Sequence, residues 1–157
     1  MRKKIIDSDR KPNVEPDPEW LDVEKLAVVE VSSEDAAFPV ESALVPGMAP
    51  GWRASGPGEQ MIRLRFDNPR QLRRIRLNFE EPAMERTQEF VLRWSGDYGQ
   101  SYREIVRQQW NFSPAGASSE TEDYHLELQA VTLLELSINP DISGSDAIAS
   151  LKELRLA

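Results

Sequence analysis

The sequence predicts an all-β protein built from antiparallel sheets that pack face to face, and three observations lead to this prediction. From residue 26 onward, apolar and polar residues alternate with the period of two that places successive side chains on opposite faces of a strand. Clusters of Gly, Pro, Asn, Asp and Ser interrupt the alternating segments and mark turns. No long segment has the periodicity of an amphipathic helix. Short strands with one buried face therefore fit the chain best.

The alternating segments define about eight strands in chain order. Residues 33–58, between the first two strands, are rich in turn residues and too numerous for a hairpin, so we expect an ordered irregular loop there. The turn Asp67-Asn68-Pro69 is expected to separate the second strand from the third. Further loops are expected at 113–122 and 139–146. The expected strands are 26–31, 62–66, 75–79, 90–94, 102–112, 124–128, 133–138 and 148–156.

The chain has 157 residues, a size that suits one domain with one hydrophobic core. Residues 1–20 differ from the rest because they are polar and rich in proline, and such a segment buries too little apolar surface to offset its ordering entropy. We therefore expect a flexible arm over residues 1–20 and a single β-sandwich domain over residues 21–157. Trp20, at the end of the arm, is expected either to dock the arm onto the domain or to contact a partner.

The formal net charge of -8 and the pI of about 4.8 argue against nucleic acid or an anionic membrane as a partner, because phosphate binding relies on Lys and Arg. The absence of cysteine excludes disulfides and Cys-ligated zinc. No segment approaches the ~20 apolar residues of a membrane span. No apolar segment of signal-peptide length follows the basic residues at the N-terminus. We therefore expect a cytoplasmic protein without a membrane span.

Few residues are placed to support catalysis. His125 is the single histidine, and the sequence marks no nucleophile that it would activate, so a surface position on a strand is favoured over a catalytic role. Adjacent acids such as Glu80-Glu81 fall in expected turns and do not by themselves place two carboxyl groups across a cleft. We expect a noncatalytic protein.

Residues 61–110 are net positive although the chain as a whole is acidic. Arginines occupy polar positions of the strands in this region, and if these strands are neighbours their side chains form a basic patch on one outer face of a sheet. One interpretation is a solvated face on which arginines pair with acids across strands. The other is a patch whose guanidinium groups bind an acidic partner or a second copy of the chain. The patch residues are Arg63, Arg65, Arg74, Arg76 and Arg93.

Two tryptophans in expected strands indicate core positions. Trp94 shares the strand face of Phe90 and Leu92, so we expect it in the core. Trp110 is also expected in the core, with an exposed stacking platform as the alternative. A ring exposed there would suit a sugar, whose apolar face stacks on aromatic side chains while polar groups bind the hydroxyls.

Four segments, taken in order, resemble one known family. Val31-Ser32-Ser33 and residues 39–44 are similar to its first strand and the small-residue loop that follows, and Gly51-Trp52-Arg53-Ala54-Ser55 is similar to its W-x-S segment with a shift of one residue. Residues 72–77 and 90–99 resemble its central strands and S-x-D-G turn, and residues 151–156 resemble its closing strand. Together these segments resemble the discoidin, or coagulation factor 5/8 type C, domain of the galactose-binding-like jelly rolls. The resemblance covers residues 25–157 and implies an antiparallel jelly-roll β-sandwich.

The resemblance implies noncatalytic binding, because the family has no common catalytic residues and its members bind carbohydrates, phospholipids or proteins through loops at one end of the sandwich. The matching loops here are 33–58, 80–87, 96–101 and 139–147. We expect recognition of a carbohydrate or glycoconjugate. The alternative is a protein-interaction or assembly module that uses the arginine-rich face or the N-terminal arm. The expected ligand-binding residues are Trp52, Arg53, Arg86, Asp97, Tyr98 and Asn139, and Trp52 is also expected to plug the end of the sandwich.

The resemblance also implies a possible structural calcium ion. Glycan-binding members of the family hold calcium partly through an Asp in the loop before the tryptophan and through a Glu of the closing strand. Glu153 matches that Glu, whereas the loop 44–50 contains no acid. Calcium prefers several oxygen ligands, and Glu153 is the one candidate metal ligand that the resemblance supplies.

Overall fold

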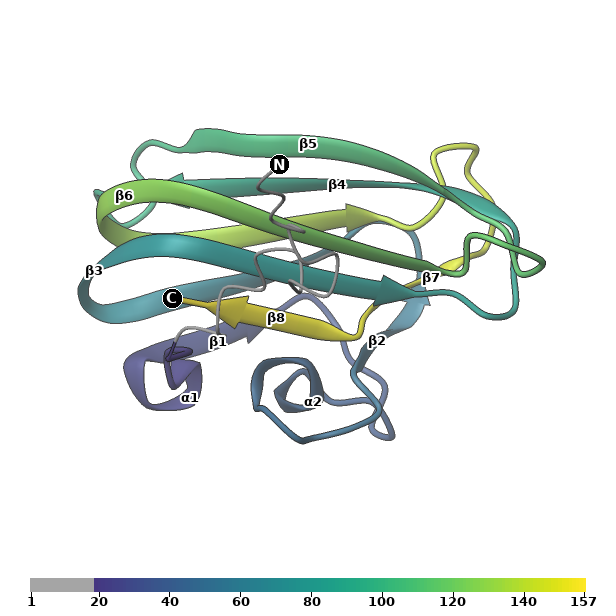
Figure 1. Cartoon of the computed structure of the whole chain (residues 1–157), viewed down its shortest axis with the longest axis horizontal. Helices are drawn as coiled ribbons and strands as arrows, with labels where there is room; N and C mark the ends of the chain where they lie inside the picture. The colour runs from purple at the N-terminus through teal and green to yellow at the C-terminus, as the bar shows by residue number, and fades with distance from the viewer. Residues whose placement is uncertain (1–18) are drawn as a thin grey trace, which may run out of the picture.

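The computed structural model describes residues 19–157, and strands dominate this part of the chain (Figure 1). Its two helices, α1 (Val23–Leu26) and α2 (Glu41–Leu44), have four residues each. No helix within residues 19–157 is long and apolar enough to cross a membrane. The strands are β1 (Ala27–Val31), β2 (Trp52–Pro57), β3 (Gln60–Glu80), β4 (Arg86–Ser95), β5 (Arg103–Phe112), β6 (Ser119–Asn139), β7 (Ile148–Leu151) and β8 (Glu153–Leu156).

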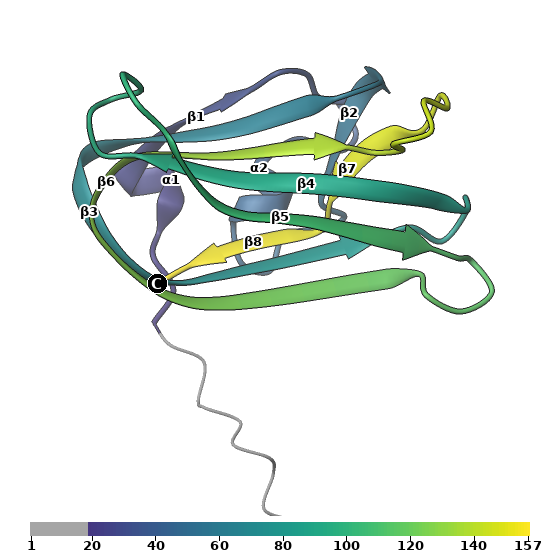
Figure 2. The same cartoon turned by 90° about the horizontal axis from the view of Figure 1, so that it is seen from above.

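The two longest strands, β3 and β6, hold the fold together because each takes part in both layers. They have 21 residues each and run antiparallel to one another, with Gln60 opposite Ile138 at one end and Glu80 opposite Ser119 at the other. The regular pairing is interrupted after Arg65, and both strands curve in this region (Figures 1 and 2). Pro69 lies in the interruption and has no N–H to donate to a neighbouring strand, which suits a corner.

The curve divides the strands into two layers, which Figure 2 shows one above the other. The five-stranded layer contains β1, the first half of β3, the second half of β6, β4 and β5 in that order. The three-stranded layer contains β8, the second half of β3 and the first half of β6. All pairings are antiparallel, and the separate pair β2–β7 lies at one end of the layers. The fold is therefore the antiparallel jelly-roll β-sandwich that the sequence predicts.

The hydrophobic core lies between the two layers and follows the alternation read from the sequence. Ile62, Leu64 and Phe66 of β3 are each 1% exposed, whereas the intervening arginines point outward. Phe79 of the three-stranded layer stacks on Phe90 of the five-stranded layer, with ring centroids 5.1 Å apart. Burial of each such side chain contributes roughly 1.5–3 kcal/mol to stability. Trp94 and Trp110 are partly buried against this core, in line with the core positions predicted for them.

Several local predictions need correction. The expected strands 124–128 and 133–138 form one strand, β6, which also begins inside the loop expected at 113–122, and the expected strand 148–156 is divided into β7 and β8. The expected turn at Asp67-Asn68-Pro69 is wrong, because β3 continues through these residues and bends instead of reversing. Alternation stops at a bend just as it does at a turn, so the pattern does not distinguish them. The stretch 33–58 is not wholly irregular, since it contains α2 and β2.

Trp20 docks the start of the described chain onto the outer face of the three-stranded layer. Its ring centroid lies 5.1 Å from Arg74 Cζ and 5.7 Å from Arg76 Cζ, within the range of cation–π attraction. The next residue, Leu21, donates its N–H to the carbonyl of Leu156 at 2.8 Å. The docking predicted for Trp20 is confirmed, while residues 1–18 of the expected arm lie outside the described residues.

Candidate functional site

Three of the four loops expected to bind a ligand gather at one end of the sandwich, where β2 and β7 pair. Arg86 Nη1 donates to the carbonyl of Pro140 at 2.6 Å and Ile142 N–H donates to the carbonyl of Thr87 at 2.9 Å. These bonds fasten the loop after β6 to the start of β4. We refer to this region as the loop end.

The fourth expected loop, 96–101, lies at the opposite end of the sandwich. Because β4 and β6 are antiparallel, Ser95 at the end of β4 pairs with Leu133, whereas Glu89 near its start pairs with Asn139. The expectation that all four loops share one end is therefore wrong for this loop. Strand alternation gives the face of a residue but not the end of the sandwich to which a loop belongs.

The loop end contains a hollow with a volume of about 230 Å³, which we call the loop-end pocket. Phe38 and Arg53 both line it and are in contact, because the guanidinium carbon lies over the ring, 5.6 Å from its centroid. Lys152 Nζ lies 3.9 Å from Glu80 Oε2, and both side chains remain solvent-accessible. The pocket thus combines one aromatic ring with two cations and one carboxylate. Its rim residues are Phe38, Pro50, Arg53, Glu80, Pro82 and Lys152.

The floor of the loop-end pocket is rigid because the backbone is tightly packed there. Gly51 has φ +98°, and a Cβ at this position would stand 2.8 Å from the carbonyl oxygen of Leu151, so only glycine is accommodated. The next residue, Trp52, is 1% exposed and donates its indole N–H to the carbonyl of Ser33 at 3.0 Å. Trp52 plugs the end of the sandwich as expected. Its ligand-binding role stays a prediction, and its buried ring offers almost no surface to a ligand.

Arg86, also expected to bind a ligand, is 4% exposed and fills an interior position. Its guanidinium carbon lies 4.8 Å from the ring centroid of Phe112, and Nη1 also donates to Gln88 Oε1 at 3.2 Å. Burial lowers the pKa of Arg86, although nearby Glu81 opposes this shift. These contacts show Arg86 holding the loop end together from inside.

Asp97 and Tyr98 form a tight turn at the end opposite the loop-end pocket. Asp97 accepts hydrogen bonds from the hydroxyl groups of Ser101 and Ser95, which hold its pKa at about 2. Tyr98 has φ 56° and is 49% exposed. Ligand binding by these two residues stays a prediction, and their site would be separate from the loop-end pocket.

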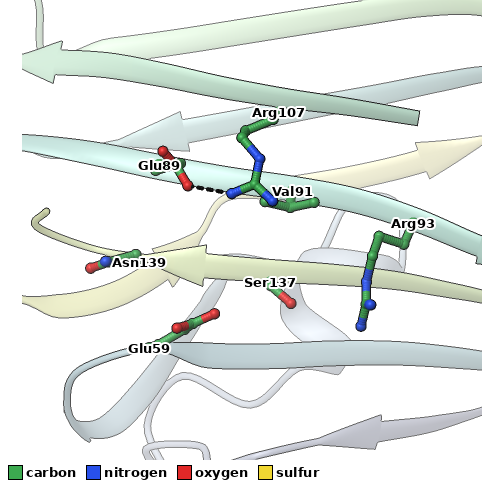
Figure 3. Close-up of a pocket in the computed structure, with 7 residues that line it drawn as sticks. All are labelled: Glu59, Glu89, Val91, Arg93, Arg107, Ser137 and Asn139. Carbon is green, nitrogen blue, oxygen red and sulfur yellow. Dashed lines mark hydrogen bonds and ion pairs between the residues drawn. The ribbon is translucent and has the colours of Figure 1, made fainter. Parts of the chain in front are cut away.

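A second hollow, of about 350 Å³, lies on the outer face of the five-stranded layer, and Figure 3 shows it. We call it the sheet-face groove. Arg107 Nη1 donates to Glu89 Oε1 at 2.7 Å across its β4–β5 side. Asn139, one of the expected ligand-binding residues, lines this groove and not the loop-end pocket. The residues of the groove are Glu59, Glu89, Val91, Arg93, Arg107, Ser137 and Asn139.

The five arginines expected to form one basic patch lie on two opposite faces. Arg63, Arg65 and Arg93 lie on the outer face of the five-stranded layer, because they belong to β4 and the first half of β3. Arg74 and Arg76 follow the curve of β3 and lie on the outer face of the three-stranded layer. The expectation of a single patch is therefore wrong, since alternation along one strand does not reveal that the strand changes layers.

Each of these arginines also has an acidic neighbour. Arg63 Nη2 lies 3.0 Å from Glu135 Oε2, and Arg93 pairs with the other oxygen of the same carboxylate. Arg74 forms a two-point pair with Asp123 at 2.9 and 2.6 Å, and Arg76 Nε lies 4.0 Å from Asp123. Arg65 Nε lies 3.4 Å from Glu30 Oε1. This geometry matches the interpretation of cross-strand pairing, while binding of a partner by these arginines stays a prediction.

Glu153, the expected calcium ligand, lies in β8 with Oε1 3.7 Å from Arg155 Nε. Within residues 19–157, no group of three or more His, Cys, Asp or Glu side chains is arranged to hold a metal ion. Glu153 therefore belongs to no such group among these residues, and its metal role stays a prediction. His125 is exposed on β6 opposite Arg74, the surface position favoured for it.

The residues of the two hollows that sequence reasoning missed include Phe38, Glu80, Lys152, Glu59, Glu89, Val91, Arg107 and Ser137. Phe38 stands in a turn-rich stretch without alternation, and no local signal separates it from a core residue. Glu89, Ser137 and Arg107 occupy polar positions of three strands, and only the pairing register brings them together. A sequence offers no direct signal for that register.

No protein-family model matches the chain, and no curated protein matches its sequence. Solved structures do match its fold. The family 32 carbohydrate-binding module of C. perfringens NanJ, in complex with galactose, aligns with a TM-score of 0.64 at 12% identity, covering 87% of this chain and 96% of that one. A pectin-binding carbohydrate-binding module aligns with a TM-score of 0.60 at 16% identity over 83% and 89% of the two chains.

A chitosan-binding module from a chitosanase/glucanase of Paenibacillus sp. IK-5 aligns with a TM-score of 0.61 at 17% identity, covering 83% and 94% of the two chains. At these identities the likeness shows the fold. That fold is an antiparallel jelly-roll β-sandwich, which agrees with the fold predicted from the sequence.

Proposed function

We propose that the protein is a noncatalytic carbohydrate-binding module that holds a sugar in the loop-end pocket. The observation that carries the proposal is the partly exposed ring of Phe38, which stands beside Arg53, Glu80 and Lys152 in one small hollow. Sugar sites combine an aromatic surface, on which the apolar face of a ring stacks, with a few polar side chains that fix the hydroxyl groups. The loop-end pocket supplies both parts.

The rigidity of the pocket supports the same proposal. The Gly51 backbone is packed against Leu151, and Trp52 is locked by its bond to Ser33, so the floor does not have to be ordered when a ligand arrives. A preformed site saves the entropy of ordering loops, which favours affinity for a small ligand. The similar solved structures include carbohydrate-binding modules, yet their ligands differ from one another, and the shared fold does not select among sugars.

The alternative, a protein-interaction or assembly module, has weaker support. Its main argument was a continuous basic patch, whereas the five arginines are divided between two faces and each has an acidic neighbour. A partner would therefore meet surfaces of mixed charge on both faces.

The test is a screen of the purified protein on an array of neutral and acidic oligosaccharides, followed by calorimetric titration with the tightest binder. We expect Phe38→Ala to weaken binding by about tenfold, because it removes the stacking surface. Tyr98→Ala is the matched control, since it removes an exposed aromatic side chain at the opposite end. We expect this control to bind as the parent protein does.

Two outcomes would contradict the proposal. The first is an array on which no sugar is retained. The second is a loss of binding in Tyr98→Ala while Phe38→Ala still binds, which would place the site in the 96–101 loop. Repeating the titration with a chelator tests the calcium role of Glu153, because a calcium-supported site would lose affinity.

A further inference from the structure

The sheet-face groove arises directly from the strand register. Met61, Ser137, Val91 and Arg107 stand in one outward-facing row across four strands, and the short side chains of Ser137 and Val91 form the floor. The row on one side contains Glu135 and Arg93, and the row on the other side contains Asn139 and Glu89. These two rows are four residues apart along a strand, about 13 Å. The rows on either side thus carry long side chains, and the short side chains of Ser137 and Val91 lie between them.

Three of the charged groups that line the groove, Glu89, Arg93 and Arg107, are already paired with neighbouring side chains. Glu89 accepts from Arg107 Nη1 at 2.7 Å and from Gln109 Nε2 at 2.9 Å. Arg107 Nη2 also donates to Glu104 at 3.0 Å. Arg93 pairs with Glu135, and its guanidinium carbon lies 4.6 Å from the ring centroid of Tyr102. An ionic ligand that bound Glu89, Arg93 or Arg107 would have to break one of these pairs and leave its partner uncompensated, which is costly.

Hydroxyl groups meet no such obstacle. A guanidinium has five N–H donors and a carboxylate has about four acceptor positions, so each paired group retains capacity for further hydrogen bonds. A hydroxyl group donates to a carboxylate and accepts from a guanidinium. Adjacent hydroxyl groups on a sugar ring can therefore bind the carboxylates and the guanidinium groups that border the groove. Ser137 and Asn139 add a hydroxyl and an amide, and Val91 offers methyl groups to the apolar face of a ring.

Charge and length narrow the ligand class further. Two glutamates and two arginines line the groove, so its lining gives a polyanionic saccharide no net attraction, and the net charge of -8 on the chain repels such a ligand. The lining of the groove extends from Glu59, the residue before β3, to Arg107 of β5, and these two strands are three inter-strand spacings apart, about 14 Å. This length exceeds a single sugar ring and suits a chain.

We propose that the sheet-face groove is a second saccharide site, which binds a neutral, linear oligosaccharide laid across β3, β6, β4 and β5. The inference extends the proposed function to a second surface, and the two sites have no residue in common. The expected contacts are hydroxyl groups on Glu89, Arg93, Arg107 and Asn139, with a ring face over Val91.

The experiment is an NMR titration of the ¹⁵N-labelled chain with cellohexaose, xylohexaose and mannohexaose in turn. At least one of these probes is expected to shift the backbone amides of residues 89–93 and 135–139. Ser137→Phe fills the floor and is expected to weaken that binding at least tenfold. Thr121→Phe is the matched control, because it adds the same ring to an outward position of β6 on the other layer, and it is expected to leave binding unchanged.

Further variants keep the test decisive. Arg107→Ala removes an exposed side chain, so it preserves the fold even if Ser137→Phe does not, and it is expected to weaken binding about threefold. Phe38→Ala is expected to retain the groove shifts, which separates this site from the loop-end pocket. The inference is overturned if none of the three probes shifts the groove amides, if polygalacturonate shifts them instead, or if Thr121→Phe loses as much affinity as Ser137→Phe.

Discussion

Two carboxylates on β6, Glu135 and Glu120, are equally buried and yet occupy opposite chemical environments. Each residue is 1% exposed. Glu135 lies in the second half of the strand, where Arg63 and Arg93 form ion pairs with its two carboxylate oxygens. Glu120 lies in the first half and faces inward, and neither of its oxygens has a hydrogen-bond partner. Equal burial therefore goes with very different partners for these two acids.

Glu135 stands in the middle of a row that crosses the whole five-stranded layer. From β1 to β5 the row reads Glu30, Arg63, Glu135, Arg93 and Glu104, so the sign of charge alternates at every strand. Alternating cross-strand pairs are favourable, whereas like charges directly opposite one another are not. Glu135 is buried because its neighbours' long side chains cover it on the outer face.

Glu120 has a different neighbour, Glu122, on the same inward face of β6. Burial raises the pKa of Glu120 to about 8, and the carboxylate of Glu122 adds to this rise. The same surroundings raise the pKa of Tyr124 two residues further on, mainly through burial. The comparison teaches that two equally buried acids can differ in their partners: Glu135 has two cations beside it, whereas Glu120 has a second carboxylate nearby and a raised pKa.

The largest expected effect comes from breaking the Glu135 pairings. Glu135→Ala leaves Arg63 and Arg93 without their shared partner, and we expect the free energy of unfolding to fall by about 2–4 kcal/mol. The decrease is not larger because both arginines are partly exposed and water can solvate them. Urea unfolding at neutral pH measures the change, and Glu135→Gln, which retains one acceptor, is expected to lose less. Equal stability of Glu135→Ala and the parent protein would contradict this account.

For Glu120 we expect substitution to raise the free energy of unfolding, the opposite of the effect at Glu135, and we expect this effect to depend on pH. The folded chain keeps Glu120 protonated up to a pKa of about 8, while the unfolded chain releases the proton near the ordinary value of 4.5. The folded state binds more protons between these values, so stability falls as pH rises through that window. Glu120→Gln is expected to raise the free energy of unfolding by about 1–3 kcal/mol at pH 8 and to flatten this slope. A series of urea titrations from pH 5 to pH 9 checks it, and an unchanged slope would refute it.

The smallest effect is expected at Asp123, a more exposed acid in the first half of β6. Its pair with Arg74 lowers the pKa of Asp123, so this contribution is present at neutral pH and is lost as pH falls through the folded pKa. Because both side chains reach solvent, Asp123→Ala is expected to cost about 0.5–1 kcal/mol, less in high salt. Thermal melts at two salt concentrations measure this. If Asp123→Ala lowers the free energy of unfolding as much as Glu135→Ala does, the burial of an ion pair does not determine its contribution to stability.

The strands and most of the core were predictable from the sequence because alternation is a local signal. Phe66 and Phe90, for example, repeat the apolar character of their neighbours two residues away, and both are buried as predicted. The continuity of β3 was not predictable, since Asp67-Asn68-Pro69 has the composition of a turn. Arg74 and Arg76 were consequently assigned to the wrong face.

The candidate sites were harder to predict because they depend on long-range register. Arg53 reaches the loop-end pocket as expected, but Phe38 lies there only through its backbone bonds with the chain around Arg53. Ser137 forms the floor of the groove because it pairs with Val91 and Met61, residues that are distant in sequence. Glu135 illustrates the same limit. Its polar position in the strand predicts an exposed side chain, but the arginines paired with it bury it.

The long antiparallel pairing of β3 with β6 also governs how the chain must fold. Gln60 pairs with Ile138, and both β4 and β5 lie between these two residues in the chain. This contact therefore closes a very long loop. The β4–β5 hairpin, in contrast, is local and can form early. Chains dominated by such distant contacts fold in milliseconds to seconds. The nascent polypeptide therefore cannot build its core until β6 has left the ribosome, when nearly the whole domain has been synthesised.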